Sequence, residues 1–426
     1  PLTIDNQEAF QRLAEICDFF LVHDRPIYLR SDDSVVRHVG GDLRFIRRSR
    51  GYVPMPIFIN KAIPATLALG AELKNTVCLS KHNRVFVSQH IGDLENLRTY
   101  QFFQQTIEHL QRIFDVHPEI VAFDQHPDYL STQHGLAMGG VQQVQVQHHH
   151  AHIVSCMAEH HLEGAVLGLA FDGTGFGSDG TVWGGEVLVC EPHRFRRVAH
   201  LEPVAMPGAA AAIRKPWRMA VAYLTATFKN DALDLGLPLL EVVGPAKLGV
   251  VNQMIAKGIN APRTSSIGRL FDAVAALVGL RQAVSFEGQA AMELEGIADP
   301  DEPGLYPFDW CEGDVVQVRL DPILEGVVNE TLAAVPAPVV AARFHNTLVT
   351  LFAELGRHLA QRYDLERVVL SGGVFQNARL LTGLYRALTQ RGLTVYTQRL
   401  VPSNDGGLCL GQAVAAAAMA SRSSTG

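Results

Sequence analysis

The stretches VQHHHAHIV (Val146–Val154) and AFDGTGFGSDGTVWGGE (Ala170–Glu186) decide how the rest of this chain is interpreted. In the first, His148 and His152 are four residues apart, so a helix would place both imidazoles on one face, a spacing that holds one metal ion. In the second, Asp172 ends an apolar run and opens a glycine-rich turn suited to phosphate oxygens. Together they predict a metal site beside a phosphate cradle, in an enzyme that handles a nucleotide or an acyl phosphate.

The composition is that of a globular protein of two or three domains. The chain has 426 residues, of which 47% are hydrophobic and 19% charged. No apolar run approaches the roughly 18–20 residues of a membrane span, and PLTIDNQEAF at the start shows no secretory signal. The net charge of -7 argues against nucleic acid as a partner, and six scattered cysteines without a CxxC pair indicate reduced thiols in the cytoplasm.

The first 56 residues form a unit of their own. A helix is expected over 9–20, then short strands at RPIYLR (25–30), SVVRHV (34–39) and LRFIRR (43–48), and GYVPMPIF (51–58) is predicted to be a linker. We place the second unit at 63–426, with lobe I at about 66–162, lobe II at about 163–426 and a helical insertion at about 209–295.

A pattern that occurs twice defines the second unit. NTVCLS and RVFVSQ form a hairpin around KHN, followed by a long helix, the strand IVAFD, a short helix, the strand VQQVQV and the histidine helix. The hairpin AVLGLAFDGTG–TVWGGEVLVC starts the second copy, and RVVLSGG, TVYTQ and an Ala-rich helix end it. This order predicts a duplicated α/β fold with a cleft between two lobes, and parallel strands carry ligands at their carboxyl ends. Residues that follow predicted strands should therefore face this cleft: Asp124, Asp172, Gly372, Gly373 and Asp405.

The histidine stretch has a functional interpretation and a neutral one. A pair of histidines four residues apart often occurs by chance on a helix surface. Three consecutive histidines and a fourth, directly after a buried strand, favour a metal site, and Asp172 and Asp405 would complete a shell that suits zinc or iron(II) better than calcium. His149 and His150 point elsewhere on a helix and are expected to contact substrate or support the ligands.

Several polar positions are candidates for nucleotide contacts. The alternatives are a simple hairpin turn for DGTGFGSDG, a polar edge turn for LGAELKNT and ordinary helix-start acids for FEGQAAMELE. Asp272 lies inside an apolar helix, where a carboxylate needs a partner or a ligand such as a ribose hydroxyl. The candidates are Lys74, Asn75, Gly173, Thr174, Asp272, Glu287, Gly372, Gly373 and Asn377.

With these motifs assembled, the chain resembles the HypF family of hydrogenase-maturation carbamoyltransferases. The motifs that carry the resemblance run from residue 69 to 412: LGAELKNT, SQHIGDL, DQHPDYLST, HHHAH, FDGTGFGSDGTVWGGE, KPWRMA, SSIGRLFDAVAALVGL, FEGQAAMELE, SGGVFQN and SNDGGLCLGQ. The domain is also similar to that of the TsaD family and of antibiotic O-carbamoyltransferases. The resemblance implies the RNase H-like fold of actin, sugar kinases and Hsp70, and residues 25–54 resemble the C-terminal end of a YrdC-like α/β domain.

The resemblance also implies a chemistry. The family's metal ligands correspond to His148, His152, Asp172 and Asp405. Its nucleotide contacts correspond to Lys74, Gly173, Thr174, Asp272, Glu287, Gly372, Gly373, Asn377 and Gly406. ATP, with Mg²⁺ as its counter-ion, and carbamoyl phosphate would form carbamoyl-adenylate. The carbamoyl group would then pass to the C-terminal cysteine of HypE, as the source of the cyanide ligands of [NiFe]-hydrogenase. We assign His149 and His150 to catalysis.

Other functions fit the same motifs less well. An O-carbamoyltransferase that acts on a small hydroxylated metabolite shares the fold and HHHAH, but KPWRMA and the upstream YrdC-like tail favour HypF. A nucleotide-dependent binding module without catalysis would not need four metal-type ligands beside a phosphate loop. A sugar kinase does not need metal-binding histidines.

Overall fold

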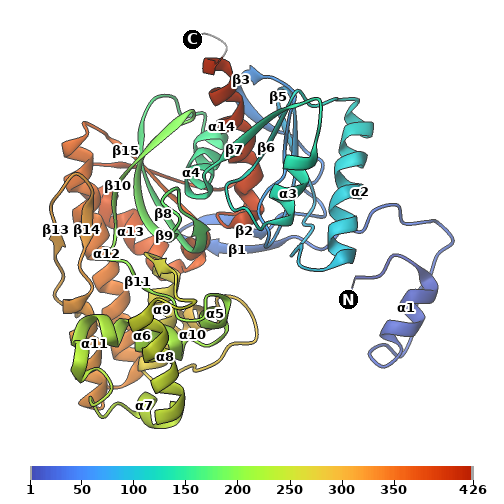
Figure 1. The fold of residues 1–426 in the computed structure, drawn as a ribbon. Coiled ribbons are helices and arrows are strands. Elements are labelled where there is room, and N and C mark those ends of the chain that lie inside the picture. The colour runs from blue at the N-terminus through green and yellow to red at the C-terminus, as the bar shows by residue number, and fades with distance from the viewer. Residues whose placement is uncertain (1, 424–426) are drawn as a thin grey trace.

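The computed structural model describes residues 2–423, which form two α/β lobes side by side with a helical region below one of them (Figure 1). Lobe I is built on a five-stranded sheet in the order β3-β5-β4-β6-β7. Its elements are β3 (Ile57–Ile63), β4 (Thr66–Ala68), β5 (Cys78–Val87), α2 (Leu97–Phe114), β6 (Ile120–Asp124), α3 (Leu130–Ala137), β7 (Gln142–Val146) and α4 (His148–Glu159).

Lobe II is built on a larger sheet whose main path is β13-β14-β10-β9-β8-β15-β16. Its strands are β8 (Val166–Phe176), β9 (Val182–Glu191), β10 (Arg194–Leu201), β13 (Trp310–Cys311), β14 (Val316–Val318), β15 (Arg367–Ser371) and β16 (Thr394–Thr397). Its helices are α11 (Asp321–Leu332), α12 (Ala337–Arg362), η2 (Gly373–Gln376), α13 (Ala378–Gln390), η3 (Asp405–Gly407) and α14 (Leu408–Ser423).

The two sheets repeat one arrangement. In lobe I, β4 pairs antiparallel with β5 and parallel with β6, and β6 pairs parallel with β7. In lobe II, β8 pairs in the same way with β9 and β15, and β15 with β16. Each last strand is followed by a helix, α4 or α14. The duplicated α/β fold predicted from the sequence is confirmed.

The predicted hairpin around KHN is present, although it is assigned to one strand, β5. The amide of Ser88 donates to the carbonyl of Val77 at 2.8 Å, so the chain reverses between them, and His82 at the reversal has φ +58°. The prediction of a linker at 51–58 was wrong at its end, because Ile57 already belongs to β3 and pairs with Val85. Lobe I therefore begins before residue 63.

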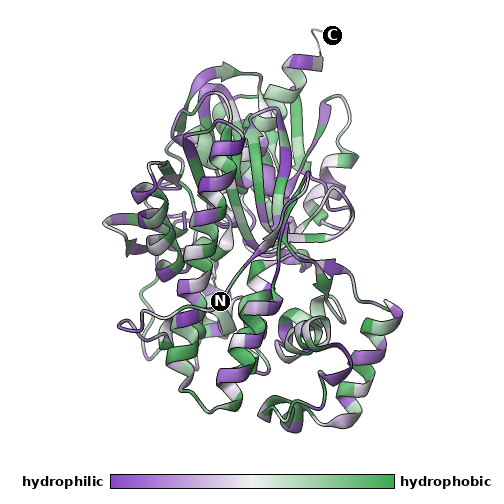
Figure 2. Cartoon of the chain, turned by 90° about the vertical axis from the view of Figure 1, so that its left-hand side faces the viewer, coloured by the Kyte–Doolittle hydropathy of each residue, from purple (hydrophilic) through white to green (hydrophobic). Residues whose placement is uncertain are grey.

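The parallel strands at the centre of each sheet are apolar because helices cover both of their faces. All five residues of β6, IVAFD, are buried. In α2, Phe103, Ile107 and Leu110 are buried, and the side chain of Asn96 caps the first turn by accepting from the amide of Thr99. Figure 2 shows the same division, with mostly hydrophobic strands inside and outer helices that carry both hydrophilic and hydrophobic residues.

The helices α4 and α14 lie side by side between the lobes (Figure 1). The first follows lobe I but packs against β8, β9 and β15 of lobe II, whereas α14 follows lobe II and packs against the lobe I strands β4 to β7. A Cβ built on Gly411 of α14 would lie 1.8 Å from the carbonyl oxygen of Ala151 in α4, so only glycine allows this approach. The two helices form a shared core that joins the lobes.

A largely helical region lies between β10 and β13. This region contains two short strands, six α-helices and one 3-10 helix. In chain order they are β11 (Val204–Ala205), α5 (Ala210–Arg214), α6 (Trp217–Phe228), η1 (Lys229–Asp231), α7 (Pro238–Val243), α8 (Pro245–Lys257), β12 (Arg263–Thr264), α9 (Ile267–Leu277) and α10 (Gln289–Ile297). No helix among residues 2–423 is long and apolar enough to cross a membrane.

The N-terminal segment contains α1 (Asn6–Leu13) and a hairpin of β1 (Val35–Val39) and β2 (Asp42–Arg47). The predicted helix over 9–20 is therefore shorter and starts earlier, with Asp5 as its N-cap. The predicted strand RPIYLR (25–30) is wrong, because these residues pair with no strand. Their alternation of apolar and polar residues matched a strand, but the segment runs over α2, where Arg30 lies above the ring of Phe102.

Candidate metal centre and ligand cavity

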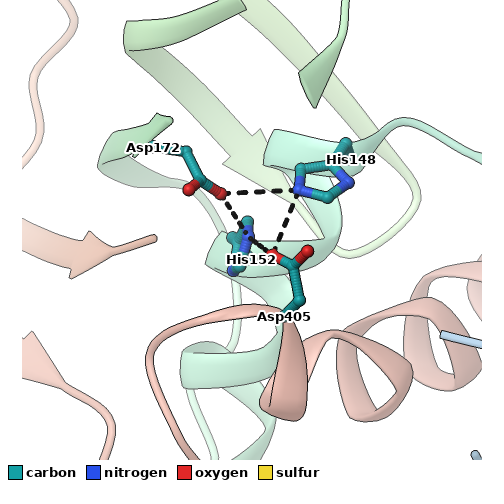
Figure 3. A group of neighbouring side chains, drawn as sticks. All are labelled: His148, His152, Asp172 and Asp405. Carbon is teal, nitrogen blue, oxygen red and sulfur yellow. Dashed lines mark ion pairs between the residues drawn. The ribbon is translucent and has the colours of Figure 1, made fainter. Parts of the chain in front are cut away.

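Two histidines and two aspartates converge where the lobes meet (Figure 3). The first turns of α4 supply the histidines, β8 supplies Asp172, and η3 supplies Asp405 just before α14. Nε2 of His152 lies 3.0 Å from Oδ2 of Asp172 and 3.5 Å from Oδ1 of Asp405. Nε2 of His148 lies 3.5 and 3.6 Å from the same two oxygens. The four residues named from the sequence as metal ligands are thus neighbours in space.

These atoms fit a metal ion. A tetrahedral zinc site with bonds of about 2.0–2.1 Å has ligand atoms about 3.3 Å apart, close to the four nitrogen–oxygen separations given above. The Nε2 atoms of His148 and His152 and Oδ2 of Asp172 are buried and have no hydrogen-bond partner among residues 2–423. Buried polar atoms without partners are costly, and an ion would satisfy all three. The mixed nitrogen and oxygen set suits zinc or iron(II).

The charges of the group reinforce one another. Burial alone would lower the pKa of His148, but the nearby carboxylates, first Asp124, outweigh it and raise this pKa well above the usual range. Burial would raise the pKa of Asp405, but the two histidines lower it to about 2. The aspartates are therefore anionic and available to a cation.

Asp124 orients the first histidine. Its Oδ2 lies 2.7 Å from Nδ1 of His148, and both side chains are fully buried. Its other oxygen accepts from the amide of His126 at 3.0 Å. The sequence placed Asp124 at a strand end facing the cleft but gave it no role; an aspartate that ends an apolar strand was the available signal.

His149 and His150 also lie in α4, but neither is within ion-pair distance of Asp172 or Asp405, and the ring of His149 lies 5.4 Å from that of His148. Nδ1 of His149 is 3.2 Å from the side chain of Gln147, and its ring lies against Gly175 of β8. Nε2 of His150 is 2.8 Å from the carbonyl of Glu191, and its ring lies 5.1 Å from that of Phe195. Both are buried against lobe II and neither lines the cavity described next, so a direct catalytic contact has no support in this geometry.

A cavity of about 680 Å³ adjoins the metal group. It lies between the lobe I loop that carries Lys74, the glycine-rich end of β8, the insertion helices α9 and α10, and the turn after β15. Six of the predicted nucleotide contacts line it, together with the ligands Asp172 and Asp405: Lys74, Gly173, Asp272, Glu287, Gly373 and Asn377.

Ion pairs contribute to the charge of the cavity. Lys74 contacts Glu287 across it, and burial, which would lower the pKa of Lys74, is outweighed by Glu287 and Asp405, which raise it. Asp272 pairs with Arg269 at 3.0 Å, and burial raises the pKa of Asp272 to about 6 although Arg269 opposes this. The cavity therefore offers cations and carboxylates together, as a phosphate and a sugar require.

Four predicted contacts lie outside the cavity lining: Asn75, Thr174, Gly372 and Gly406. Asn75 is fully buried, and its amide nitrogen donates to the carbonyls of Leu69 and Ala71, which closes the loop that presents Lys74. Gly372 is needed for packing, since a Cβ there would lie 2.2 Å from the carbonyl of Phe171.

Sequence reasoning also missed part of the lining. Val35, Arg37 and Ile46 of the N-terminal hairpin line the cavity, and Arg37 pairs with Glu295 of α10 at 3.2 Å. Arg269 was missed as well, although its spacing of three residues from Asp272 on a helix was a usable signal.

This duplicated two-lobed α/β fold, with its histidine–aspartate cluster and adjoining cavity, is a Kae1-like domain. Two family models agree: "HypF Kae1-like domain" over residues 61–159, and "Carbamoyltransferase, Kae1-like Domain, second subdomain" over 168–412. The chain belongs to the HypF carbamoyltransferase family, as the sequence motifs predicted.

Individual relatives point the same way. The chain is 42% identical to carbamoyltransferase HypF2 of Cupriavidus necator, over 97% of this chain and 54% of that protein, and 40% identical to carbamoyltransferase HypF of a Synechocystis species, over 97% and 55%. It superposes on a crystal structure of full-length HypF in the phosphate- and nucleotide-bound form, with TM-score 0.94 and 41% identity over 98% of this chain and 55% of that one. HypF of T. kodakarensis gives TM-score 0.90 and 33% identity over 99% and 56%. The chain thus spans about half the length of these relatives.

Proposed function

We propose that this chain carries out the transfer step of a HypF carbamoyltransferase. In this proposal the cavity takes carbamoyl-adenylate, made from carbamoyl phosphate and ATP, and the carbamoyl group passes to the C-terminal cysteine of HypE. The observation that supports it is the meeting of His148, His152, Asp172 and Asp405, from both lobes, at the edge of a cavity of about 680 Å³. The nucleotide-bound state of a HypF structure with 41% identity adds support.

The residues that line the cavity have separate roles in this proposal. The four ligands hold one divalent ion, zinc or iron, which when bound polarises the carbamoyl carbonyl or holds the adenylate phosphate. Lys74 and the amide of Gly173 bind phosphate oxygens, and Asp272 accepts a hydrogen bond from a ribose hydroxyl. When ATP is bound, a magnesium ion accompanies it as the counter-ion of its phosphates. Gly373 allows close approach of the backbone, and Asn377 lies at the start of α13.

The transfer itself needs no nucleophile from this chain. The thiolate of the acceptor cysteine attacks the carbamoyl carbon, a carbon–sulfur bond forms, and the bond to the adenylate oxygen breaks, so that AMP leaves with its electron pair. The backbone amides of the glycine-rich turn stabilise the oxyanion that develops on the carbonyl. Lys74 balances the charge of the departing phosphate.

We place the protein in the cytoplasm, where its thiols stay reduced, without a nucleic-acid or membrane partner. All six cysteines are free, and four of them are buried. The net charge of -7 gives no general attraction for nucleic acid.

The experiment is transfer from supplied carbamoyl-adenylate to HypE, followed by mass spectrometry of the acceptor's C-terminal peptide. We expect one carbamoyl group on the cysteine, and loss of transfer after chelation or in the double variant His148→Ala, His152→Ala. Transfer that survives with the metal gone contradicts the role of the ion. Carbamoylation of a small hydroxylated metabolite in place of HypE identifies the O-carbamoyltransferase alternative.

A further inference from the structure

One face of α4 carries more than the two histidine ligands. The residues at positions 148, 152, 155 and 159 follow spacings of four, three and four, so their side chains form one stripe along the helix. The stripe reads His148, His152, Ser155 and Glu159. The first two face Asp172 and Asp405, and the last two contact the segment of chain that presents Asp405.

Glu159 holds the backbone between β16 and η3. Its Oε1 accepts from the amide of Arg399 at 2.5 Å, and its Oε2 accepts from the amides of Leu400 and Val401 at 3.0 and 3.4 Å. Its side chain is only 1% exposed. A buried carboxylate that satisfies three backbone donors cannot be removed without leaving those donors unpaired.

Ser155 holds the same segment from its other end. Its hydroxyl donates to the carbonyl of Gly407 at 2.7 Å, and Gly407 belongs to η3 together with Asp405. Asp405 therefore lies between two anchored positions, Val401 before it and Gly407 after it. Both anchors come from the helix that carries the histidines.

We infer that Glu159 and Ser155 are positioning residues for the metal centre: they fix Asp405 at a set distance from His148 and His152. The inference rests on the proposed metal site and adds to it the residues that build it. The helix α4 thus sets the spacing of three of the four ligands. It carries His148 and His152 itself, and it holds Asp405 through the segment that Glu159 and Ser155 bind. Residues outside the ligand shell that orient ligands commonly change metal affinity by about 10–100-fold.

The test measures affinity for Zn²⁺ and Co²⁺ on the whole chain by calorimetry and by the visible spectrum of bound Co²⁺. We expect Glu159→Gln to weaken binding by about 10–100-fold and to shift the Co²⁺ spectrum, because the amide nitrogen of glutamine faces backbone donors. Ser155→Ala should weaken metal binding less than Glu159→Gln does. If the Glu159 variant does not fold, Ser155→Ala takes its place in the same measurement. Glu163→Gln is the matched control, since Glu163 is exposed and pairs with Lys61.

A double-mutant cycle separates positioning from general loosening of the fold. If Glu159 acts through Asp405, adding Glu159→Gln to Asp405→Asn should change the remaining affinity by less than about twofold. An equal loss in both backgrounds, or wild-type affinity in both Glu159→Gln and Ser155→Ala, overturns the inference. A wild-type chain that binds no ion, or binds it as well without Asp405, refutes the proposed metal site itself and the inference with it.

Discussion

Oδ2 of Asp124 lies 2.7 Å from Nδ1 of His148, and neither side chain is exposed to solvent. An imidazole that donates its Nδ1 proton to a carboxylate presents the lone pair of Nε2 on its opposite side. That side of His148 faces Asp172 and Asp405. The last residue of β6 thus sets the tautomer of the histidine that begins α4.

We predict that Asp124→Asn weakens Zn²⁺ binding by about 10–100-fold, because an amide is a poorer acceptor and does not fix the tautomer of His148. Calorimetric titration of the metal-free chain measures the change. The control is Asp128→Asn, four residues on and exposed, which should bind as the wild type does. Equal affinity in Asp124→Asn and wild type would show that the hydrogen bond does not orient the ligand.

We predict that Gly411→Ala destabilises the chain and weakens metal binding together. The new methyl group would lie 1.8 Å from the carbonyl of Ala151, so α14 and α4 must separate, and such overpacking against backbone costs about 3 kcal/mol or more. Urea unfolding and metal titration measure the two effects. Gly249→Ala in α8 is the control: its Cβ meets open space within the described part of the chain, and alanine should stabilise that helix by about 0.5–1 kcal/mol.

The grouping of the four residues at the candidate metal site could be predicted from the sequence because their positions follow from periodicity. His148 and His152 share a helix face by spacing alone, Asp172 follows the apolar run VLGLAF within β8, and Asp405 comes after β16. The duplicated order of strands and helices likewise depends on hydrophobic patterns that local sequence contains.

Side-chain direction and contacts between distant segments could not be predicted in this way. Asn75 and Lys74 are neighbours in one motif, yet Asn75 turns inward to close the loop and Lys74 faces the cavity. The pairing of Lys74 with Glu287 joins residues 213 positions apart. Nothing in the local pattern of Arg37 indicated that a hairpin so far upstream would line the cavity.

We predict that nucleotide affinity rises with pH through about pH 6 if Asp272 accepts a ribose hydroxyl. Burial raises the pKa of Asp272 to about 6, so the carboxyl group is largely protonated below that pH and anionic above it. The ligand binds the anionic form, so acidification should weaken AMP binding, by about tenfold for each pH unit well below the pKa. Equilibrium binding of AMP between about pH 5 and 7.5 measures this. Asp272→Asn should show a flat profile in that range, and an unchanged slope in this variant would assign the titration to another group.

We predict that His345→Leu lowers the free energy of unfolding through its effect on Asn377. Nδ1 of His345 donates to the carbonyl of Ala341 at 2.7 Å, which leaves Nε2 to accept from the amide nitrogen of Asn377 at 2.9 Å. The amide oxygen of Asn377 caps α13 by accepting from Leu380, so one asparagine links this buried histidine to a helix start at the cavity. Leucine leaves the Asn377 donor unpaired, at a cost of about 1–3 kcal/mol, whereas the same change in an Asn377→Ala background should cost less.

The pH dependence of the free energy of unfolding gives a second check on the role of His345. Burial lowers its pKa to about 4, so the folded state keeps the ring neutral while the unfolded chain takes up a proton below about 6.5. Between these values the unfolded state binds more protons, so this contribution is complete above about pH 6.5 and is lost as the pH falls toward 4. Wild type should lose about 2 kcal/mol from this group between pH 6.5 and 5, and His345→Leu should lose that much less. Urea unfolding at the two pH values measures the difference, and equal losses in both proteins would show that His345 is not held neutral by burial.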